Sequence, residues 1–227
     1  GASVCRSAGI PIAGGHTIDS VEAIYGLVAL GLVHPKHVKR NADARPGDVL
    51  VLGKPLGVGV MSAALKKGAL DAAGYAQMIA TTTRLNTPGP DLAALPGVHA
   101  LTDVTGFGLA GHALEMARGA RCDVTLDWSA VPQLPAVREL AERGYVTGAS
   151  GRNWAGYGAD VVLPAGFAAV DQALLSDPQT SGGLLVACDP AEVDSVLAVF
   201  ARHGFDQAAV VGRIAAAAGD APRRRVS

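Results

Sequence analysis

The stretch Leu101-Thr-Asp-Val-Thr-Gly-Phe-Gly108 joins an apolar run to a helical pattern through a short polar turn. Val98–Asp103 predicts a strand, and Leu109–Arg118 predicts a helix that ends at Gly119. Enzymes with alternating strands and helices often place their sites at such junctions. The stretch therefore indicates both a fold class and a candidate site.

A second polar segment, Asp177-Pro-Gln-Thr-Ser-Gly-Gly183, precedes the most apolar strand pattern of the chain, at residues 184–187. The hydroxyls of Thr180 and Ser181 and the backbone donors of the glycine pair could line a cleft. Equally, the segment could be a rigid connector whose aspartate and proline set a turn. We assign it no site role. For Asn153, in the loop expected at 151–158, we likewise make no assignment.

Strand patterns alternate with amphipathic helical patterns from about residue 46 onward, which predicts an α+β fold (layered α/β). The turn signal Arg45-Pro46-Gly47-Asp48 suggests a domain boundary, with residues 1–45 and 46–227 on its two sides. Residues 1–8 resemble the tail of a helix. The further strands are expected at 10–13, 25–33, 49–52, 124–126 and 210–214. The further helices are expected at 58–67, 71–85, 91–95, 135–143 and from Asp189-Pro190 to about residue 202.

Composition narrows the function classes. The chain has 227 residues, 49% of them hydrophobic and 17% charged, with a net charge of −1. That balance argues against nucleic-acid binding, which needs a strong basic field. Its apolar runs are too short to span a membrane, and its three scattered cysteines favour a reducing compartment. We expect a soluble, cytoplasmic protein in which Cys188 is buried.

Two basic features are given ordinary explanations. Arg223-Arg224-Arg225 is expected to be a solvated tail or an edge strand, because charge runs usually lie at exposed positions. Lys54 lies beside Pro55 at a turn and could meet a phosphate, but we expect it to be solvated.

Trp154 is expected to be a packing residue. In the helix from Asp71, we expect an inner face that carries Tyr75, Met78, Ile79 and Thr82.

Asp103 is the most interesting carboxylate, because it ends an apolar strand beside a glycine-rich turn. Backbone N–H groups at such a turn favour phosphate oxygens, and a carboxylate can hold the accompanying Mg²⁺. An Asx-turn or helix cap without a ligand would look the same. Gly14-Gly15-His16-Thr17 follows another strand pattern, where missing Cβ atoms would let a phosphate approach, although a tight turn explains the glycines as well.

Three segments in this order resemble the signature segments of selenophosphate synthetases (selenide, water dikinases): Gly14–Asp19, Leu101–Gly108 and Asp177–Gly183. The resemblance implies an aminoimidazole ribonucleotide synthetase-like (PurM-like) fold, with part of an N-terminal dimerisation and ATP domain and a complete C-terminal domain. It implies that Asp103 is a Mg²⁺ ligand and that Gly14, Gly15, His16 and Thr17 contact ATP. Asp19 is a lesser candidate. The family acts as a homodimer on ATP and selenide.

The resemblance also implies what this sequence does not contain. The family carries a catalytic Cys or selenocysteine, an essential Lys and further metal-binding aspartates in an N-terminal segment that has no match here. Cys5 lies in a predicted helix and is not assigned that role. Phosphoryl transfer needs several anionic ligands around Mg²⁺, so we expect no catalytic residue in this chain and no activity from it alone. Two alternatives stay open: another ATP-using enzyme of the superfamily, such as aminoimidazole ribonucleotide synthetase or a hydrogenase-maturation homologue, or a non-catalytic binding or assembly module.

Overall fold

The computed structural model describes residues 1–218 and 224–226. The chain divides into two compact units, Gly1–Val38 and Lys39–Ser227. The domain division between residues 45 and 46 stays a prediction.

The first unit contains little regular structure. Its elements are the helix α1 (Ala2–Ser7), which agrees with the helical pattern of residues 1–8, and the 3-10 turn η1 (Pro35–His37). The strands predicted at 10–13 and 25–33 are wrong, since neither segment is a strand. A strand is stabilised by hydrogen bonds to a neighbouring strand, and none of the described strands pairs with these segments. Their apolar side chains are exposed, as Leu30 and Leu32 illustrate.

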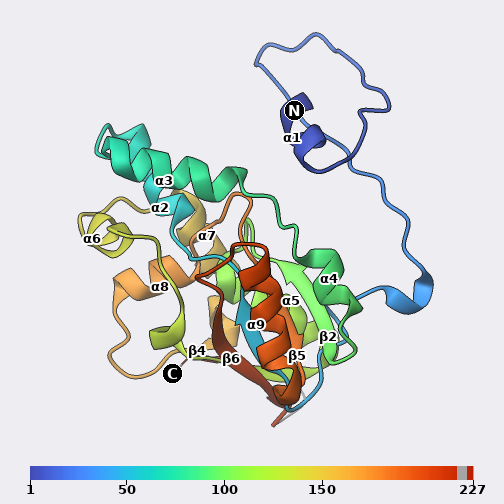
Figure 1. The fold of residues 1–227 in the computed structure, drawn as a ribbon. Helices are drawn as coiled ribbons and strands as arrows, with labels where there is room; N and C mark the ends of the chain where they lie inside the picture. The colour runs from blue at the N-terminus through green and yellow to red at the C-terminus, as the bar shows by residue number, and fades with distance from the viewer. Residues whose placement is uncertain (219–223, 227) are drawn as a thin grey trace. The chain divides into compact units, whose positions relative to one another are not determined.

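The second unit is built on one mixed sheet (Figure 1). Its described strands are β1 (Val49–Leu52), β2 (Val98–Asp103), β3 (Cys122–Leu126), β4 (Val161–Val162), β5 (Leu184–Cys188), β6 (Ala209–Ala216) and β7 (Arg224–Val226). Their order is β2-β5-β1-β6-β3-β7-β4. The pairs β2–β5, β5–β1, β1–β6 and β6–β3 are antiparallel, whereas β7 runs parallel to β3 and β4.

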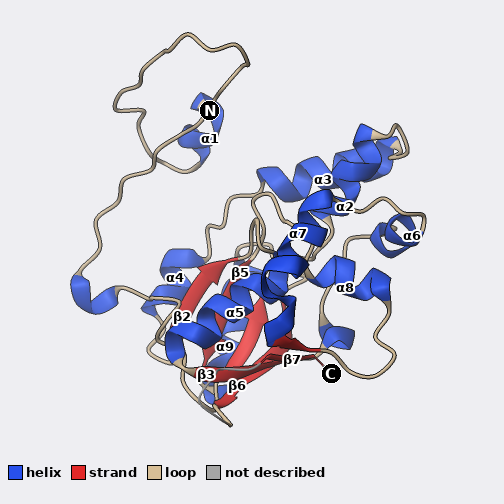
Figure 2. Ribbon diagram, turned by 180° about the vertical axis from the view of Figure 1, so that it is seen from behind, coloured by secondary structure: helices blue, strands red, loops and turns tan. Residues whose placement is uncertain are grey.

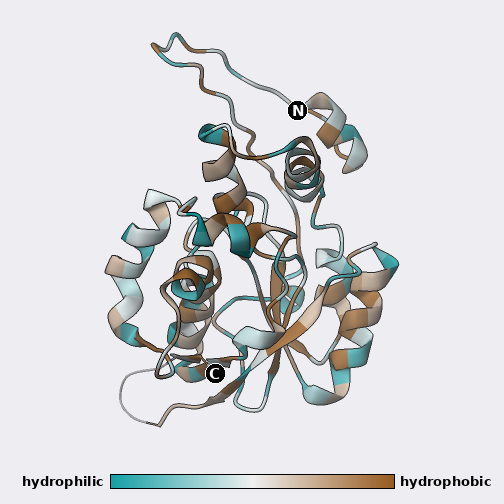
Figure 3. Ribbon diagram, turned by 90° about the vertical axis from the view of Figure 1, so that its left-hand side faces the viewer, coloured by the Kyte–Doolittle hydropathy of each residue, from teal (hydrophilic) through white to brown (hydrophobic). Residues whose placement is uncertain are grey.

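The central strands are buried on both faces, which confirms the prediction for the unbroken apolar run at 49–52. In β1, Leu50 and Leu52 join the core cluster beneath α5, whereas Val51 joins the cluster beneath α9. In β5, alternate residues divide between the same two clusters, and Cys188 is fully buried as expected. Helices therefore cover both sides of the sheet (Figure 2). The hydropathy colouring in Figure 3 shows brown strands at the centre.

The remaining helices complete the unit. Their bounds are α2 (Val58–Lys66), α3 (Ala72–Thr83), α4 (Gly89–Ala94), α5 (Gly108–Ala120), α6 (Val137–Glu142), α7 (Gly148–Tyr157), α8 (Ala169–Leu175) and α9 (Val193–Arg202). Short 3-10 turns occur at η2 (Trp128–Ala130), η3 (Gly158–Asp160) and η4 (Pro190–Glu192). A third cluster holds α2, α3, α6 and α8 together through residues such as Met61, Met78, Leu140 and Leu174.

The observed starts of the helices match the sequence-based predictions better than their buried faces and their ends do. Asp71 caps α3, with 2.7 Å from its Oδ1 to the Gly74 nitrogen, and Asp189 caps η4. On α3, however, only Met78 is buried, and the side chains of Tyr75 and Ile79 are exposed. The predicted inner face of α3 was therefore too wide.

Helix α5 continues past Gly119 and ends at Ala120, with Arg121 as its C-cap residue at a φ of +53°. Gly119 is required for close packing, because a Cβ there would lie 2.8 Å from the Cβ of Ala42. The loop predicted at 151–158 is also wrong, because α7 occupies most of it. Thr147 caps α7 by accepting a 3.0 Å hydrogen bond from the Ser150 nitrogen, a signal that the glycine-rich composition concealed. Helix α8 was not predicted.

The basic run near the C-terminus also differs from expectation. Arg223 lies outside the described residues, but Arg224 and Arg225 belong to β7. This strand lies between β3 and β4, so it is neither a tail nor an edge strand. Trp154 packs against the core cluster as expected. Among residues 1–218 and 224–226, no helix combines the length and apolarity that crossing a bilayer requires.

Candidate active site at the end of strand β2

The antiparallel pairing of β2 with β5 brings the two polar motifs together. Asp103, the last residue of β2, is opposite Leu184, the first residue of β5. One residue further on, the Val104 nitrogen donates a 2.9 Å hydrogen bond to the Gly183 carbonyl. The turn after Asp103 and the connector 177–183 are therefore neighbours at one end of the sheet. Asp103 is exposed there, so its carboxylate is accessible from solvent.

The turn that leads from β2 into α5 is held by hydrogen bonds on several sides. The Thr105 carbonyl accepts from the nitrogens of Gly108, at 3.1 Å, and Gln179, at 2.9 Å. Asn153 Nδ2 on α7 donates to the carbonyls of Gly106 and Ser176. These bonds fix the turn relative to the connector, so the backbone beside Asp103 is preorganised.

Most of the connector 177–183 is a buried structural element. Asp177 Oδ2 accepts from the Gly59 and Val60 nitrogens at 3.0 and 3.3 Å. Gln179 Oε1 accepts from those of Gly57 and Val58 at 3.1 and 3.2 Å. Both side chains thereby satisfy free N–H groups at the start of α2. Burial raises the pKa of Asp177 to about 7 despite these hydrogen bonds.

The tip of the connector differs from its base. Thr180 and Ser181 are exposed, and Ser181 has a φ of +50°. The following glycines leave no room for side chains: a Cβ at Gly182 would lie 1.9 Å from the Val104 carbonyl oxygen, and one at Gly183 would lie 2.3 Å from the Lys54 nitrogen. Asp177 and Gln179 thus fit the hypothesis of a rigid connector. Thr180 and Ser181, in contrast, present two hydroxyls at the end of the sheet.

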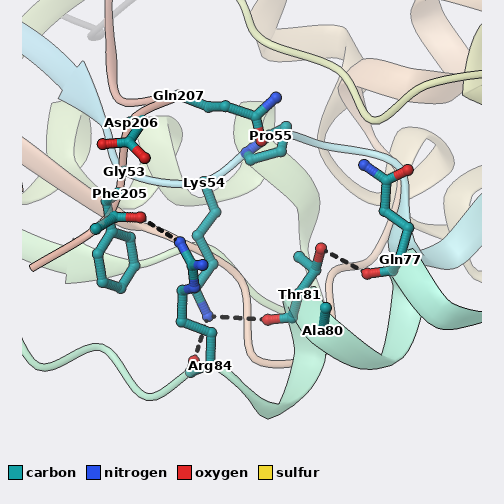
Figure 4. Close-up of a pocket in the computed structure, with 11 residues that line it drawn as sticks. Gly53, Lys54, Pro55, Gln77, Ala80, Thr81, Arg84, Phe205, Asp206 and Gln207 are labelled. Carbon is teal, nitrogen blue, oxygen red and sulfur yellow. Dashed lines mark hydrogen bonds between the residues drawn. The ribbon is translucent and has the colours of Figure 1, made fainter. Parts of the chain in front are cut away.

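Lys54 is buried, so the expectation of a solvated lysine is wrong. Its Nζ donates to the carbonyls of Arg84 and Ser181, both at 2.7 Å, and to that of Thr81 at 3.3 Å. Figure 4 shows Lys54 reaching the end of α3 along the wall of a cavity of about 360 Å³. Burial lowers the pKa of Lys54 to about 8, with a smaller contribution from Arg84. Its partners come from distant segments, so no local pattern could have indicated this role.

His112 is a second residue that sequence reasoning missed. It lies on α5 near the turn and is buried. Its Nε2 is 3.3 Å from Thr105 Oγ1, and its Nδ1 is 2.8 Å from Glu115 Oε2. The only sequence signal is its position, four residues after the Gly-Phe-Gly turn.

The proposed nucleotide contacts Gly14, Gly15, His16 and Thr17, with the lesser candidate Asp19, lie in the first unit, whereas Asp103 lies in the second. They are exposed and outside regular secondary structure. A Cβ built at Gly14 or Gly15 would have no neighbour within 4 Å, so packing does not require glycine at either position. Contact of these residues with ATP therefore stays a prediction.

Asp103 fits a magnesium site as one of several ligands. Across the described part of the chain, no three His, Cys, Asp or Glu side chains are grouped so that they could hold a metal. Magnesium usually keeps several waters and binds one or two carboxylates together with substrate phosphates. A single exposed carboxylate at a strand end matches such a partial donor set.

Comparison with known proteins places this chain in a family. The model for the C-terminal domain of AIR synthase related proteins matches residues 45–223. A selenide, water dikinase of Burkholderia ambifaria is 68% identical over 214 residues, which are 94% of this chain and 60% of that protein. The chain thus spans about 60% of the length of the curated relatives it matches.

Two solved structures share the fold. Escherichia coli HypE has a TM-score of 0.60 at 24% sequence identity. The match covers 83% of this chain and 48% of the HypE chain. Hydrogenase maturation protein HypE in complex with ATP has a TM-score of 0.52 at 20% identity, with 79% and 46% covered. At these identities the likeness concerns the fold alone, and it agrees with the predicted α+β, AIR-synthetase-like architecture. The chain belongs to the family of AIR synthase related proteins and, within that family, it is similar in sequence to the selenide, water dikinases.

Proposed function

We propose that this chain forms the C-terminal part of a selenophosphate synthetase, which makes selenophosphate from selenide, ATP and water and releases AMP and phosphate. The observation that carries the proposal is the adjacency of the two motifs at the end of the sheet, where Asp103 is exposed beside a preorganised turn. The sequence similarity to named selenide, water dikinases supports the choice of substrate.

In this proposal Asp103 is a Mg²⁺ ligand, and Gly14, Gly15, His16 and Thr17 contact ATP. A bound Mg²⁺ would neutralise charge on the phosphates during transfer. The residues of this chain would hold and orient Mg²⁺ and ATP. Asp103 offers a carboxylate, and the hydrogen bonds of Asn153 and Gln179 keep the turn beside Asp103 in place. The ATP-bound state of the structurally similar HypE supports a nucleotide ligand for this fold.

Three further expectations belong to the same proposal. The complete enzyme acts as a homodimer in the cytoplasm. We expect the 227-residue chain alone to have no turnover, because phosphoryl transfer needs several anionic ligands around Mg²⁺. Adding ATP, Mg²⁺ and selenide to it should yield no AMP above background, and turnover would show that the catalytic groups are misplaced.

The decisive experiment uses the longest natural polypeptide that contains this chain. Asp103→Ala should abolish Mg²⁺-dependent AMP formation from ATP and selenide while leaving the unfolding transition unchanged. Asp194→Ala, at an exposed carboxylate on α9, is the matched control and should retain activity. Retained activity in Asp103→Ala would make Asp103 a turn residue. Turnover of formylglycinamidine ribonucleotide instead of selenide would indicate an aminoimidazole ribonucleotide synthetase.

A further inference from the structure

We propose that His112, held by Glu115, fixes the Thr105 hydroxyl so that its oxygen acts as a hydrogen-bond acceptor on the turn beside Asp103. This oxygen would accept a hydrogen bond from a water molecule bound to the Mg²⁺–phosphate complex. His112 is thus a positioning residue, and Thr105 is the group that meets the ligand. The inference rests on the proposed function, because it uses Asp103 as the cation ligand.

The direction of the hydrogen bonds follows from the chemistry of the three groups. The Glu115 carboxylate can only accept, so His112 Nδ1, at 2.8 Å, carries the hydrogen. In a neutral imidazole, Nε2 then has a free lone pair and accepts from Thr105 Oγ1, at 3.3 Å. The hydroxyl hydrogen of Thr105 is thereby committed, and the oxygen keeps only lone pairs to offer.

The surroundings hold this chain of groups in one arrangement. The His112 side chain is only 8% exposed, and its ring lies 5.7 Å from the Phe107 ring. Glu115 is three residues further along α5, the spacing at which side chains meet on one helix face. The main chain of Thr105 is fixed by the hydrogen bonds from Gly108 and Gln179. The contact with His112 Nε2 therefore favours one rotamer of the Thr105 hydroxyl, on a turn whose main chain is already fixed.

An acceptor oxygen suits the ligand expected at this turn. Thr105 follows Asp103 by two residues, on the turn that the site contains. Waters bound to Mg²⁺ direct their hydrogens outward, and Mg²⁺ retains several such waters in proteins. A hydroxyl whose own hydrogen is committed accepts from such a water without competition.

A threonine, a histidine and a carboxylate also occur together elsewhere, which supplies a control. His203 lies 3.0 Å from Thr87 Oγ1 through Nδ1 and 2.8 Å from Asp91 Oδ2 through Nε2. Thr87 is exposed and belongs to neither motif. Loss of this second Thr–His–carboxylate chain should leave the site unaffected.

The first test needs no activity. In the ¹⁵N-labelled chain at pH 8, long-range ¹H–¹⁵N spectra should show the His112 ring with hydrogen on Nδ1 and a bare Nε2. Thr105→Val should shift the Nε2 resonance, and Glu115→Gln should mix the tautomers. A His112 ring with hydrogen on Nε2 would overturn the proposal, because Thr105 would then receive a hydrogen bond from the ring and keep its own hydrogen free.

The second test measures Mg²⁺-dependent AMP formation in the longest natural polypeptide. Thr105→Val and His112→Leu should lower kcat by roughly tenfold or more, the effect of losing one hydrogen bond to a charged complex, with KM for ATP little changed. Thr105→Ser should retain activity, and His112→Gln, whose amide oxygen can accept the same bond, should retain more than His112→Leu. Thr87→Val and His203→Leu should match wild type.

The outcomes separate the two proposals. If Asp103→Ala abolishes turnover but Thr105→Val does not lower kcat, the positioning role fails and the proposed function survives. If Asp103→Ala is fully active, the proposed function fails, and the acceptor role at the cation site fails with it even where the spectra show the expected tautomer.

Discussion

The Asp177 carboxylate lies directly against Gly59, with 3.0 Å between Asp177 Oδ2 and the Gly59 nitrogen. A Cβ built at residue 59 would lie 2.3 Å from Asp177 Oδ1 and 2.7 Å from the Pro178 carbonyl oxygen. The first turn of α2 and the base of the connector therefore touch without space for a single methyl group.

Gly59→Ala should destabilise the protein by about 1–3 kcal/mol, because the methyl group must displace buried backbone and a buried carboxylate. Urea denaturation gives the free energy of unfolding. Gly151→Ala in α7 is the control, since a Cβ there has no neighbour within 4 Å. This second change should stabilise by roughly 0.5–1 kcal/mol through helix propensity. Equal effects of the two substitutions would contradict the close contact at Gly59.

Asp177 should make stability depend on pH in an unusual direction. Burial raises the pKa of its carboxyl to about 7 in the folded state, against about 3.9 in an unfolded chain. The stability it contributes is complete below about pH 4 and is lost as the pH rises to about 7. The free energy of unfolding of wild type relative to Asp177→Asn should therefore fall by on the order of 3–4 kcal/mol over this range. A difference that stays constant with pH would show that the carboxyl titrates normally.

Lys54→Met should cost about 2–3 kcal/mol or more, because the carbonyls of Thr81, Arg84 and Ser181 lose a common donor. The exposed Lys67 gives a control, and Lys67→Met should change the free energy of unfolding by less than about 0.5 kcal/mol. Chemical denaturation of both variants beside wild type measures the difference. A neutral Lys54→Met would mean that the three carbonyls find other donors.

Burial of Lys54 should also make the stability of the protein depend on pH. Burial lowers the pKa of its ammonium group to about 8 in the folded state, against about 10.4 in an unfolded chain. The neutral form is favoured by folding, so this contribution is complete above the unfolded value and is lost as the pH falls through 8. Wild type should gain stability relative to Lys54→Met between pH 8 and 10.5, and a flat comparison would argue against a buried amine.

Asn153→Ala should loosen the turn beside Asp103. Its Nδ2 donates at 2.8 Å to the Gly106 carbonyl and at 3.1 Å to that of Ser176. We expect a loss of about 1–2 kcal/mol and faster amide hydrogen exchange at Phe107 and Gly108. The neighbouring Arg152→Ala, at an exposed position on the same helix, should leave both quantities unchanged. Unaltered exchange in Asn153→Ala would show that the turn holds itself.

Local patterns predicted what is decided locally. The unbroken apolar run of β1 indicated a strand covered on both faces, and Asp71 indicated the start of α3, because burial and capping leave direct marks in the sequence. Helix α7 was missed because three glycines hid a helix that its Thr147 cap and the packing of Trp154 stabilise. The strands expected before residue 34 lacked a pairing partner within the described chain, and propensity alone does not supply one.

The candidate site likewise has features that the sequence could predict and features that only the fold reveals. Asp103 could be chosen from its place at a strand end, and it is exposed there. That its turn adjoins the connector depends on the pairing of Asp103 with Leu184 across β2 and β5, a contact between distant segments that spacing cannot predict. The buried ammonium group of Lys54 depends on carbonyls at three separate positions, so it could be recognised only from the fold.

The position of β7 has a practical consequence for handling this protein. Val226 is buried, and its strand is the link by which β4 joins the rest of the sheet. Trimming the last few residues would detach β4 as well as removing β7. A purification peptide fused there would begin beside an interior strand, so it would need a flexible spacer to keep its bulk away from the sheet.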